Sequence, residues 1–196
     1  MKIMAGLLAA GTSSRMGKNK AFLPIDEKVL VDFSLSALQS IANEDVFIIT
    51  GQHHKEFASK LPQRNLLFNS QYSSGMASSI VVAAQHAQDS SYDALLIHLA
   101  DLPSVVDDDI RQILAEFSKN PKQVVASRRD PMDPSSLAPP CIFPRDFFPQ
   151  LLSLTGDQGA KSLLEELRAQ SLPLTFPWQD VDDESSYKAW VSSKIN

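Results

Sequence analysis

The sequence predicts an α/β protein with a mostly parallel, twisted sheet covered by helices on both faces, in three α/β/α layers. Short apolar runs of strand length alternate with segments of helical periodicity along the whole chain. That alternation is typical of parallel strands joined by crossover helices. No internal repeat or low-complexity linker interrupts it. We therefore expect one domain over residues 1–196.

The expected strands are short apolar runs, and the first of them ends directly before a polar loop. They cover residues 3–8, 46–49, 66–68, 94–99, 124–126 and 172–176. The expected helices carry apolar residues at spacings of three and four, over residues 30–41, 76–87, 107–117, 156–167 and 185–191. Asp157 is a suitable N-cap for the fourth helix. Four prolines mark the segment between Arg128 and Ile142, which we expect to be an irregular loop over the sheet.

Composition and charge exclude several classes of protein. The net charge is −5 with a pI near 5.3, which argues against general binding to nucleic acid or to anionic membranes. No run approaches the roughly 20 apolar residues that span a bilayer, and the N-terminus does not resemble a signal peptide. The single cysteine, Cys141, lies in an apolar run and is expected in the core. We expect a cytoplasmic protein.

The loop after the first strand has the composition of an anion site. Small residues at Ala9, Ala10 and Gly11 allow the backbone to approach a ligand closely, and their N–H groups can point at phosphate oxygens. Ser13 and Ser14 add hydroxyl donors. They are followed by three cations, Arg15, Lys18 and Lys20. The alternative is a solvated basic turn, but the position after the first strand favours a ligand site.

The pattern Leu8-Ala9-Ala10-Gly11-x-Ser13-x-Arg15-Met16-Gly17-x-x-Lys20 resembles the signature loop of the MobA-like nucleotidyltransferases. Within that family it is closest to the molybdenum cofactor cytidylyltransferases. The resemblance implies a Rossmann-like fold of the nucleotide-diphospho-sugar transferase type. It also implies that the loop, including Leu8, wraps a nucleoside triphosphate, and that Arg15 and Lys20 neutralise it as catalytic residues.

Further segments extend the resemblance from residue 3 to about residue 190. The pattern Asn69-x-x-Tyr72-x-x-Gly75-Met76-x-Ser78-Ser79 is similar to the segment that lies against the base and ribose, which implies nucleotide-binding roles for Gly75, Ser78 and Ser79. Leu99-Ala100-Asp101-Leu102-Pro103 resembles the strand-end motif whose aspartate binds Mg²⁺ and takes part in catalysis. Asp182 is the expected second metal ligand, with Asp180 left as an alternative.

By this resemblance the reaction is transfer of CMP from CTP to the phosphate of molybdopterin carrying molybdenum, with release of pyrophosphate. An apo molybdoenzyme is the expected protein partner. Ala10 favours CTP, because family members with glycine there resemble guanylyl enzymes. Where the family carries glycines and a histidine on the acceptor side, this chain has Asp133 to Pro140. That departure leaves open guanylyl transfer, a sugar-phosphate or other phosphorylated acceptor, and a non-catalytic carrier of the pterin cofactor. His98 is expected to be a buried, hydrogen-bonded residue and not a catalytic one.

Overall fold

The first strand, β1 (Ile3–Ala9), is apolar on both faces and lies inside the sheet. Met4 and Leu8 point into one core cluster, and Ala5 and Leu7 point into the other. This alternation follows from the period of two along a strand, and burial on both faces is typical of a parallel sheet between helices. The structure is a computed structural model, and it describes residues 1–11, 19–156, 159–175 and 177–195.

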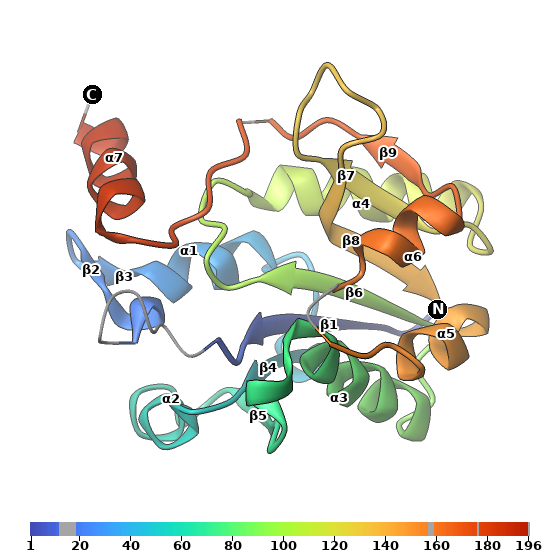
Figure 1. Cartoon of the computed structure of the whole chain (residues 1–196), viewed down its shortest axis with the longest axis horizontal. Helices are drawn as coiled ribbons and strands as arrows, with labels where there is room; N and C mark the ends of the chain where they lie inside the picture. The colour runs from blue at the N-terminus through green and yellow to red at the C-terminus, as the bar shows by residue number, and fades with distance from the viewer. Residues whose placement is uncertain (12–18, 157–158, 176, 196) are drawn as a thin grey trace.

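Among the described residues, seven strands form the main sheet in the order β5-β4-β1-β6-β8-β7-β9 (Figure 1). Neighbouring strands are parallel except where β8 pairs with β6 and β7. The prediction of a mostly parallel sheet is therefore confirmed. The remaining strands are β4 (Val46–Thr50), β5 (Asn65–Phe68), β6 (Ala94–Leu99), β7 (Val125–Arg128), β8 (Leu137–Pro144) and β9 (Gln170–Leu172).

Helices cover both faces of the sheet, which confirms the predicted three layers (Figure 1). One face packs against α1 (Leu30–Ala37), α2 (His54–Lys60) and α4 (Asp107–Lys119). The other face packs against α3 (Met76–Asp89), α5 (Phe148–Leu152) and α6 (Lys161–Glu166). The described ranges also contain four short 3-10 helices: η1 (Lys20–Phe22), η2 (Asn43–Asp45), η3 (Tyr72–Ser74) and η4 (Arg145–Phe147).

The last helix, α7 (Glu184–Ile195), packs away from the main sheet, against the hairpin of β2 (Pro24–Ile25) and β3 (Lys28–Val29). Trp190 of α7 is buried in one cluster with Leu23, Ile25 and Leu30. The Tyr187 hydroxyl donates to the carbonyl oxygen of Pro24. These contacts join the end of the chain to the segment that follows the predicted phosphate loop.

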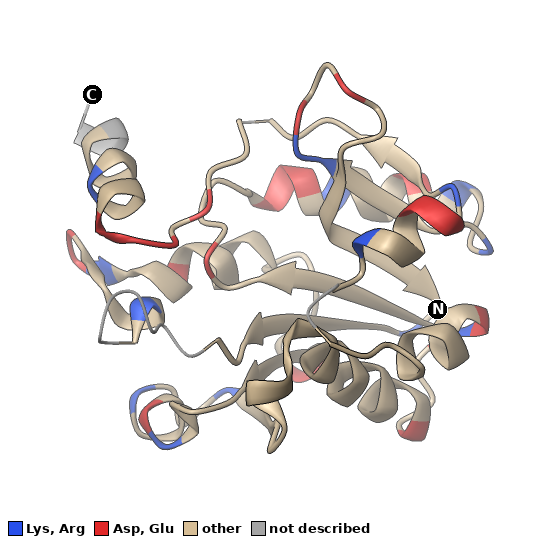
Figure 2. Ribbon diagram, viewed as in Figure 1, with Lys and Arg blue, Asp and Glu red and all other residues tan. Residues whose placement is uncertain are grey.

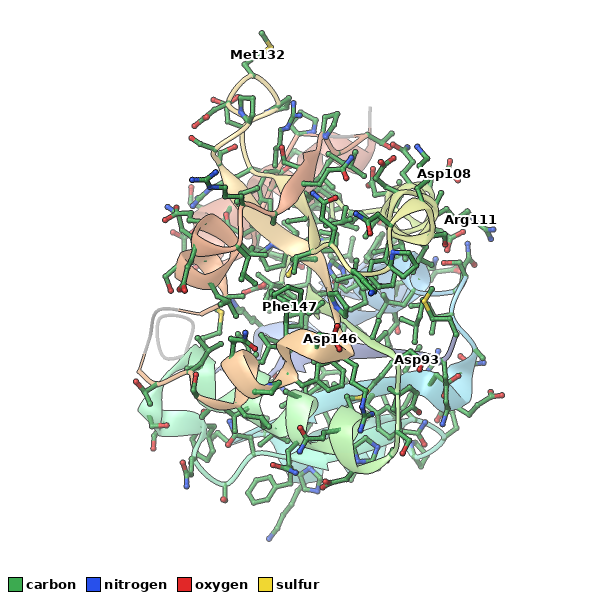
Figure 3. All side chains as sticks on the ribbon, turned by 90° about the vertical axis from the view of Figure 1, so that its right-hand side faces the viewer. Asp93, Asp108, Arg111, Met132, Asp146 and Phe147 are labelled. Atoms are coloured by element: carbon green, nitrogen blue, oxygen red, sulfur yellow. The ribbon has the colours of Figure 1, made fainter. Side chains whose placement is uncertain are left out.

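The expectation of a loop between Arg128 and Ile142 is wrong for its second half. Residues 137–144 form β8, which lies between β6 and β7 in the sheet. The pairing with β7 passes from Cys141 directly to Ala138, so Pro139 and Pro140 fall in a bulge where no ladder N–H is required. Only residues 129–136 project from the sheet, with Met132 89% exposed at the tip (Figure 3).

Smaller differences have local causes. The predicted helix over residues 156–167 begins only at Lys161, because Gly156 and Gly159 have φ of 70° and 51°. Asp157, the expected N-cap, lies outside the described residues. The last strand, predicted from residue 172 onward, instead covers Gln170–Leu172 and ends before Pro173. The sequence analysis did not predict α2, α5 or the hairpin of β2 and β3.

Cys141 and His98 are fully buried titratable residues in the core. Cys141 is fully buried, as predicted, and burial raises the pKa of its thiol. His98 is also fully buried, but neither ring nitrogen has a hydrogen-bond partner among the described residues, so the expectation of a hydrogen-bonded histidine is wrong. Burial lowers the pKa of His98 to about 3, which keeps the ring neutral. None of the helices in the described ranges has both the length and the hydropathy to cross a membrane.

Candidate functional site

A cavity of about 410 Å³ lies at the carboxyl ends of β1 and β6, where ligands bind in open α/β sheets. The wall of the cavity is formed by the end of β1, by η1, by the start of α3 and by the end of β6. Small residues dominate the part contributed by β1 and its loop. The lining residues are Leu8, Ala9, Ala10, Gly11, Asn19, Lys20, Ala21, Tyr72, Ser73, Gly75, Met76, Ser79, Leu99, Ala100 and Asp101.

Most of the predicted site residues that the structure describes line this one cavity. They are Leu8, Ala9, Ala10, Gly11, Lys20, Gly75, Ser79 and Asp101. Ser13, Ser14 and Arg15 lie outside the described residues. Gly75 has φ of 111°, a backbone conformation that favours glycine, and it forms the turn directly before α3. The cavity therefore gathers segments that are far apart in the sequence.

A lysine holds two carboxylates together at the edge of the cavity. Lys20 Nζ donates to Asp101 Oδ2 over 2.5 Å and to Asp182 Oδ1 over 2.8 Å. The three side chains come from η1, from the end of β6 and from the segment before α7. The side chain of Lys20 is 19% exposed, against 25% for Asp101 and 47% for Asp182. The predicted pair of metal ligands thus converges on one cation.

The charge state of Lys20 follows from this environment. Burial alone would lower the pKa of the ammonium, but the charge and hydrogen bonds of Asp101 and Asp182 outweigh it and raise the pKa above its ordinary value. Lys20 is therefore fully protonated at neutral pH.

Within the described ranges, no group of three or more His, Cys, Asp or Glu side chains has the geometry of a metal cluster.

The ion pairs of Lys20 place Asp182 beside Asp101. The N–H of Val181 donates to the carbonyl oxygen of Asp101 over 2.8 Å, and Val181 itself is buried. Asp182 directly follows Val181 in the chain, and its Oδ1 accepts from Lys20 Nζ. Figure 2 shows the acidic segment before α7 on the same side of the molecule as the acidic end of β6.

Asn69 orders the two serines at the start of α3. Its amide donates to Ser78 Oγ over 2.8 Å and to Ser79 Oγ over 3.0 Å, while its oxygen accepts the N–H of Gln71. Because a backbone N–H can only donate, this last bond fixes the orientation of the amide. Ser79 lines the 410 Å³ cavity. Ser78 instead donates to the carbonyl oxygens of Gln71 and Gly75 and lines a second cavity of about 490 Å³, so its nucleotide-binding role stays a prediction.

Sequence reasoning missed Gly51, which lies under the cavity wall. A Cβ atom at this position would lie 2.6 Å from the carbonyl oxygen of Ala10 and 2.6 Å from Tyr72 Cβ. Gly51 therefore allows the loop after β1 and the aromatic residue of η3 to approach each other. Nothing in the local sequence marks it, because the three contacting segments meet only in the fold.

The sequence profile described as the MobA-like NTP transferase domain matches residues 5–171, which include β1 and most of the cavity wall. The chain belongs to this family. The family resemblance found from the loop pattern is thereby confirmed, and residues 5–171 form a MobA-like NTP transferase domain. Asp182 and α7 lie beyond the matched range.

This MobA-like chain is similar in sequence to two relatives with described functions. It is 31% identical over 139 residues to the probable molybdenum cofactor guanylyltransferase of Rhodopirellula baltica, a match that covers 70% of this chain and 65% of that protein. The match therefore spans slightly less than two thirds of that relative. The chain is also 27% identical over 167 residues to the purine catabolism protein PucB of Bacillus subtilis, covering 81% of this chain and 78% of that one.

The fold is shared with solved nucleotidyltransferases. A nucleotidyl transferase from Methanothermobacter superposes with a TM-score of 0.81 at 18% identity, covering 100% of this chain and 99% of the other. At this level of identity the comparison defines the fold alone, which is that of the nucleotide-diphospho-sugar transferases.

Proposed function

We propose that this MobA-like protein transfers CMP from CTP to the phosphate of molybdopterin carrying molybdenum, with release of pyrophosphate. The observation that carries the proposal is the convergence of Lys20, Asp101 and Asp182 at the end of a cavity walled by small residues. A triphosphate needs close backbone approach, a mobile cation and acidic ligands for a metal. The described part of the site supplies all three, and Arg15 adds a second cation from the sequence.

The residues present fit a Mg²⁺ ion. Two carboxylates that both contact Lys20 Nζ are close enough to contact a single metal ion as well. Mg²⁺ in nucleotide sites is held by one or two carboxylates, with phosphate oxygens and water completing its shell. In this proposal Asp101 and Asp182 hold Mg²⁺, which neutralises charge on the phosphates when bound.

The proposed reaction needs no protein nucleophile. An oxygen of the acceptor phosphate forms a bond to the α-phosphorus of CTP, and the bond from that phosphorus to the bridging oxygen of the β-phosphate breaks. The electron pair leaves with pyrophosphate. Leu8 to Gly11 position the triphosphate by backbone contact, while Arg15 and Lys20 stabilise the negative charge on the leaving group. Gly75 and Ser79 border the space for the ribose and base.

The choice of base rests on Ala10 of the loop, and the hydroxyl of Ser79 is a donor for the base. Ala10 is 5% exposed and lines the cavity, so its methyl group narrows the pocket relative to the glycine of guanylyl-type loops. Since Asn69 donates to Ser79 Oγ, the Ser79 hydroxyl retains its hydrogen for an acceptor on the base, such as the carbonyl that cytosine and guanine both carry. GTP is the second candidate, because the Rhodopirellula relative is described as a guanylyltransferase.

The acceptor is the part of the proposal with competing alternatives. Molybdopterin is favoured by the family resemblance and by the molybdenum cofactor function given for the Rhodopirellula relative. A sugar phosphate or another phosphorylated acceptor is the alternative, since Asp133 to Pro140 form a projecting loop and a bulged strand where the family carries glycines and a histidine. A carrier that binds the pterin and delivers it to an apo molybdoenzyme without chemistry is the alternative of another class.

A pyrophosphate-release assay tests the proposal. Purified protein with Mg²⁺ is given each of CTP, GTP, ATP and UTP, with molybdopterin or a sugar phosphate as acceptor, and the products are identified by mass. We expect release with CTP and the pterin. We also expect Arg15→Ala and Lys20→Ala to lower turnover by about 100-fold or more, whereas Lys28→Ala, on the hairpin and outside the cavity lining, is unchanged. Pterin binding without pyrophosphate from any triphosphate would instead establish the carrier.

A further inference from the structure

Lys20 differs from the other basic residues in its ion pairs. Of the ion pairs between described residues, most join side chains three or four positions apart on one helix, such as Arg111 with Asp107. Lys20 instead contacts carboxylates from two distant segments, at 2.5 and 2.8 Å, and its side chain is 19% exposed. The ammonium thus occupies the place between the two acidic groups that the proposed function gives to a divalent metal.

A metal ion and the ammonium cannot both sit between the same carboxylate oxygens. With Lys20 in place, the negative charge of the two carboxylates is half compensated, and an arriving divalent cation meets a positive charge at contact distance. Removing the ammonium leaves two unpaired, partly buried carboxylates, which is costly without a replacement cation. Lys20 and the metal therefore compete for one acidic pair.

A triphosphate offers Lys20 a second partner. Lys20 lines the same cavity as Ala9, Ala10 and Gly11, so bound phosphates lie within the range of its flexible stem. Phosphate oxygens can accept the ammonium while they supply ligands to a metal held by Asp101 and Asp182. A single rotation of the lysine side chain would then exchange one cation for another, without a change in the fold.

We propose that Lys20 is the resident cation of the Asp101–Asp182 pair, and that the divalent metal enters this pair only when a triphosphate draws the ammonium away. The proposal rests on the proposed function for the identity of the site. It makes metal and triphosphate binding mutually dependent, because a coupling free energy between two ligands is reciprocal. The nucleotide-free enzyme then keeps its acidic pair closed to free metal ions.

The test measures Mn²⁺ binding to the nucleotide-free protein. The electron paramagnetic resonance signal of free Mn²⁺ reports how much of the ion remains unbound. We expect Lys20→Met, which keeps the stem and removes the charge, to bind Mn²⁺ about 5- to 100-fold more tightly than wild type, the usual range for coupled sites. Lys28→Met removes the same charge from the hairpin and is the matched control. An equal gain in Lys28→Met, or no gain in Lys20→Met, overturns the proposal.

Two further variants locate the gain. Lys20→Met combined with Asp182→Asn should lose the added affinity, since one of the two carboxylates is then neutral. Lys20→Arg keeps the charge and should bind Mn²⁺ as weakly as wild type. If Lys20→Met does not fold, Lys20→Arg still tests the proposal, because tighter Mn²⁺ binding in this variant would contradict it. Retained tight binding in the double variant would place the metal elsewhere and contradict the proposal.

Thermal unfolding gives an independent readout. In wild type, Mn²⁺ should raise the melting temperature only together with CTP, whereas in Lys20→Met it should do so alone. If wild type releases pyrophosphate but wild type and Lys20→Met bind Mn²⁺ equally, the proposed exchange of Lys20 for metal is wrong and the proposed function stands. If Lys20→Met gains Mn²⁺ affinity but no triphosphate is turned over by wild type, the exchange stands and the proposed function fails.

Discussion

The backbone N–H of Val181 donates to the carbonyl oxygen of Asp101 over 2.8 Å. This bond joins the end of the chain to the end of β6, and it brings Asp182 beside Lys20. Val181 is buried in one cluster with Trp190 of α7. The acidic pair therefore depends on how α7 packs against the hairpin of β2 and β3.

Trp190→Ala should weaken metal binding from a distance. The side chain is 5% exposed, and its loss leaves a cavity beside Leu23, Ile25 and Leu30, which should lower the free energy of unfolding by about 3 kcal/mol. We expect α7 to loosen and the stabilisation by Mn²⁺ with CTP to decrease, as measured by thermal unfolding. Tyr187→Phe removes one hydroxyl contact from the same helix and keeps the ring. It is the control, with an expected loss of about 1 kcal/mol and a normal metal response.

Gly51→Ala should lower the stability of the ligand-free protein. The added methyl group would lie 2.6 Å from both the Ala10 carbonyl oxygen and Tyr72 Cβ, so the cavity wall has to shift, at a cost of about 1–3 kcal/mol in stability. Gly11→Ala is the counterpart, because no described residue lies within 4 Å of a Cβ atom there. We expect unchanged stability of the free protein for Gly11→Ala, but weaker CTP binding by calorimetry. Equal stabilities of the two variants would contradict this account of Gly51.

Ser79→Ala and Ser78→Ala should separate the two serines. Both hydroxyls accept a hydrogen bond from Asn69, but only Ser79 lines the 410 Å³ cavity. We expect Ser79→Ala to weaken CTP binding by about 1–3 kcal/mol, through loss of a hydrogen bond to the base. Ser78→Ala should cost folding stability and leave the Kd for CTP unchanged. Titration calorimetry of both variants distinguishes the roles, and a larger loss of CTP affinity in Ser78→Ala would show that the pocket is assigned wrongly.

The parts of the fold that the sequence predicts are those set by periodicity. The strand before Asp101 and the strand before Ala10 are short apolar runs, and carboxyl ends of parallel strands meet at one edge, which is where Lys20 and Asp101 lie. β8 was not expected, because Pro139 and Pro140 normally exclude a central strand and the bulge that accommodates them depends on the partner strand.

Finer details of the site depend on contacts that no local pattern encodes. Ser78 and Ser79 are adjacent on a helix, where successive side chains point about 100° apart, so only the packing of α3 decides which faces the cavity. Gly51 matters because of Ala10 and Tyr72, which approach it from other segments. His98 was expected in the core, but its lack of a hydrogen-bond partner is a property of the tertiary surroundings.

His98 should make the stability of the protein depend on pH. Its pKa is lowered from 6.5 to about 3 by burial, so the unfolded chain takes up a proton below pH 6.5 and the folded chain does not. The free energy of unfolding should therefore be at its full value above pH 6.5 and fall as the pH decreases towards 3. Between pH 6.5 and 5 the expected loss from this group is about 2 kcal/mol, at about 1.36 kcal/mol per pH unit.

His98→Leu removes both unpaired nitrogens and the titration, and it should be as stable as wild type or more so at pH 7. Urea unfolding of both proteins at pH 7, 6 and 5 measures the difference. His86, whose pKa burial also lowers, titrates in both proteins and cancels in the comparison. Parallel pH profiles for wild type and His98→Leu would mean that the His98 ring is protonated in the folded state, and the view of a neutral, buried ring in β6 would have to be abandoned.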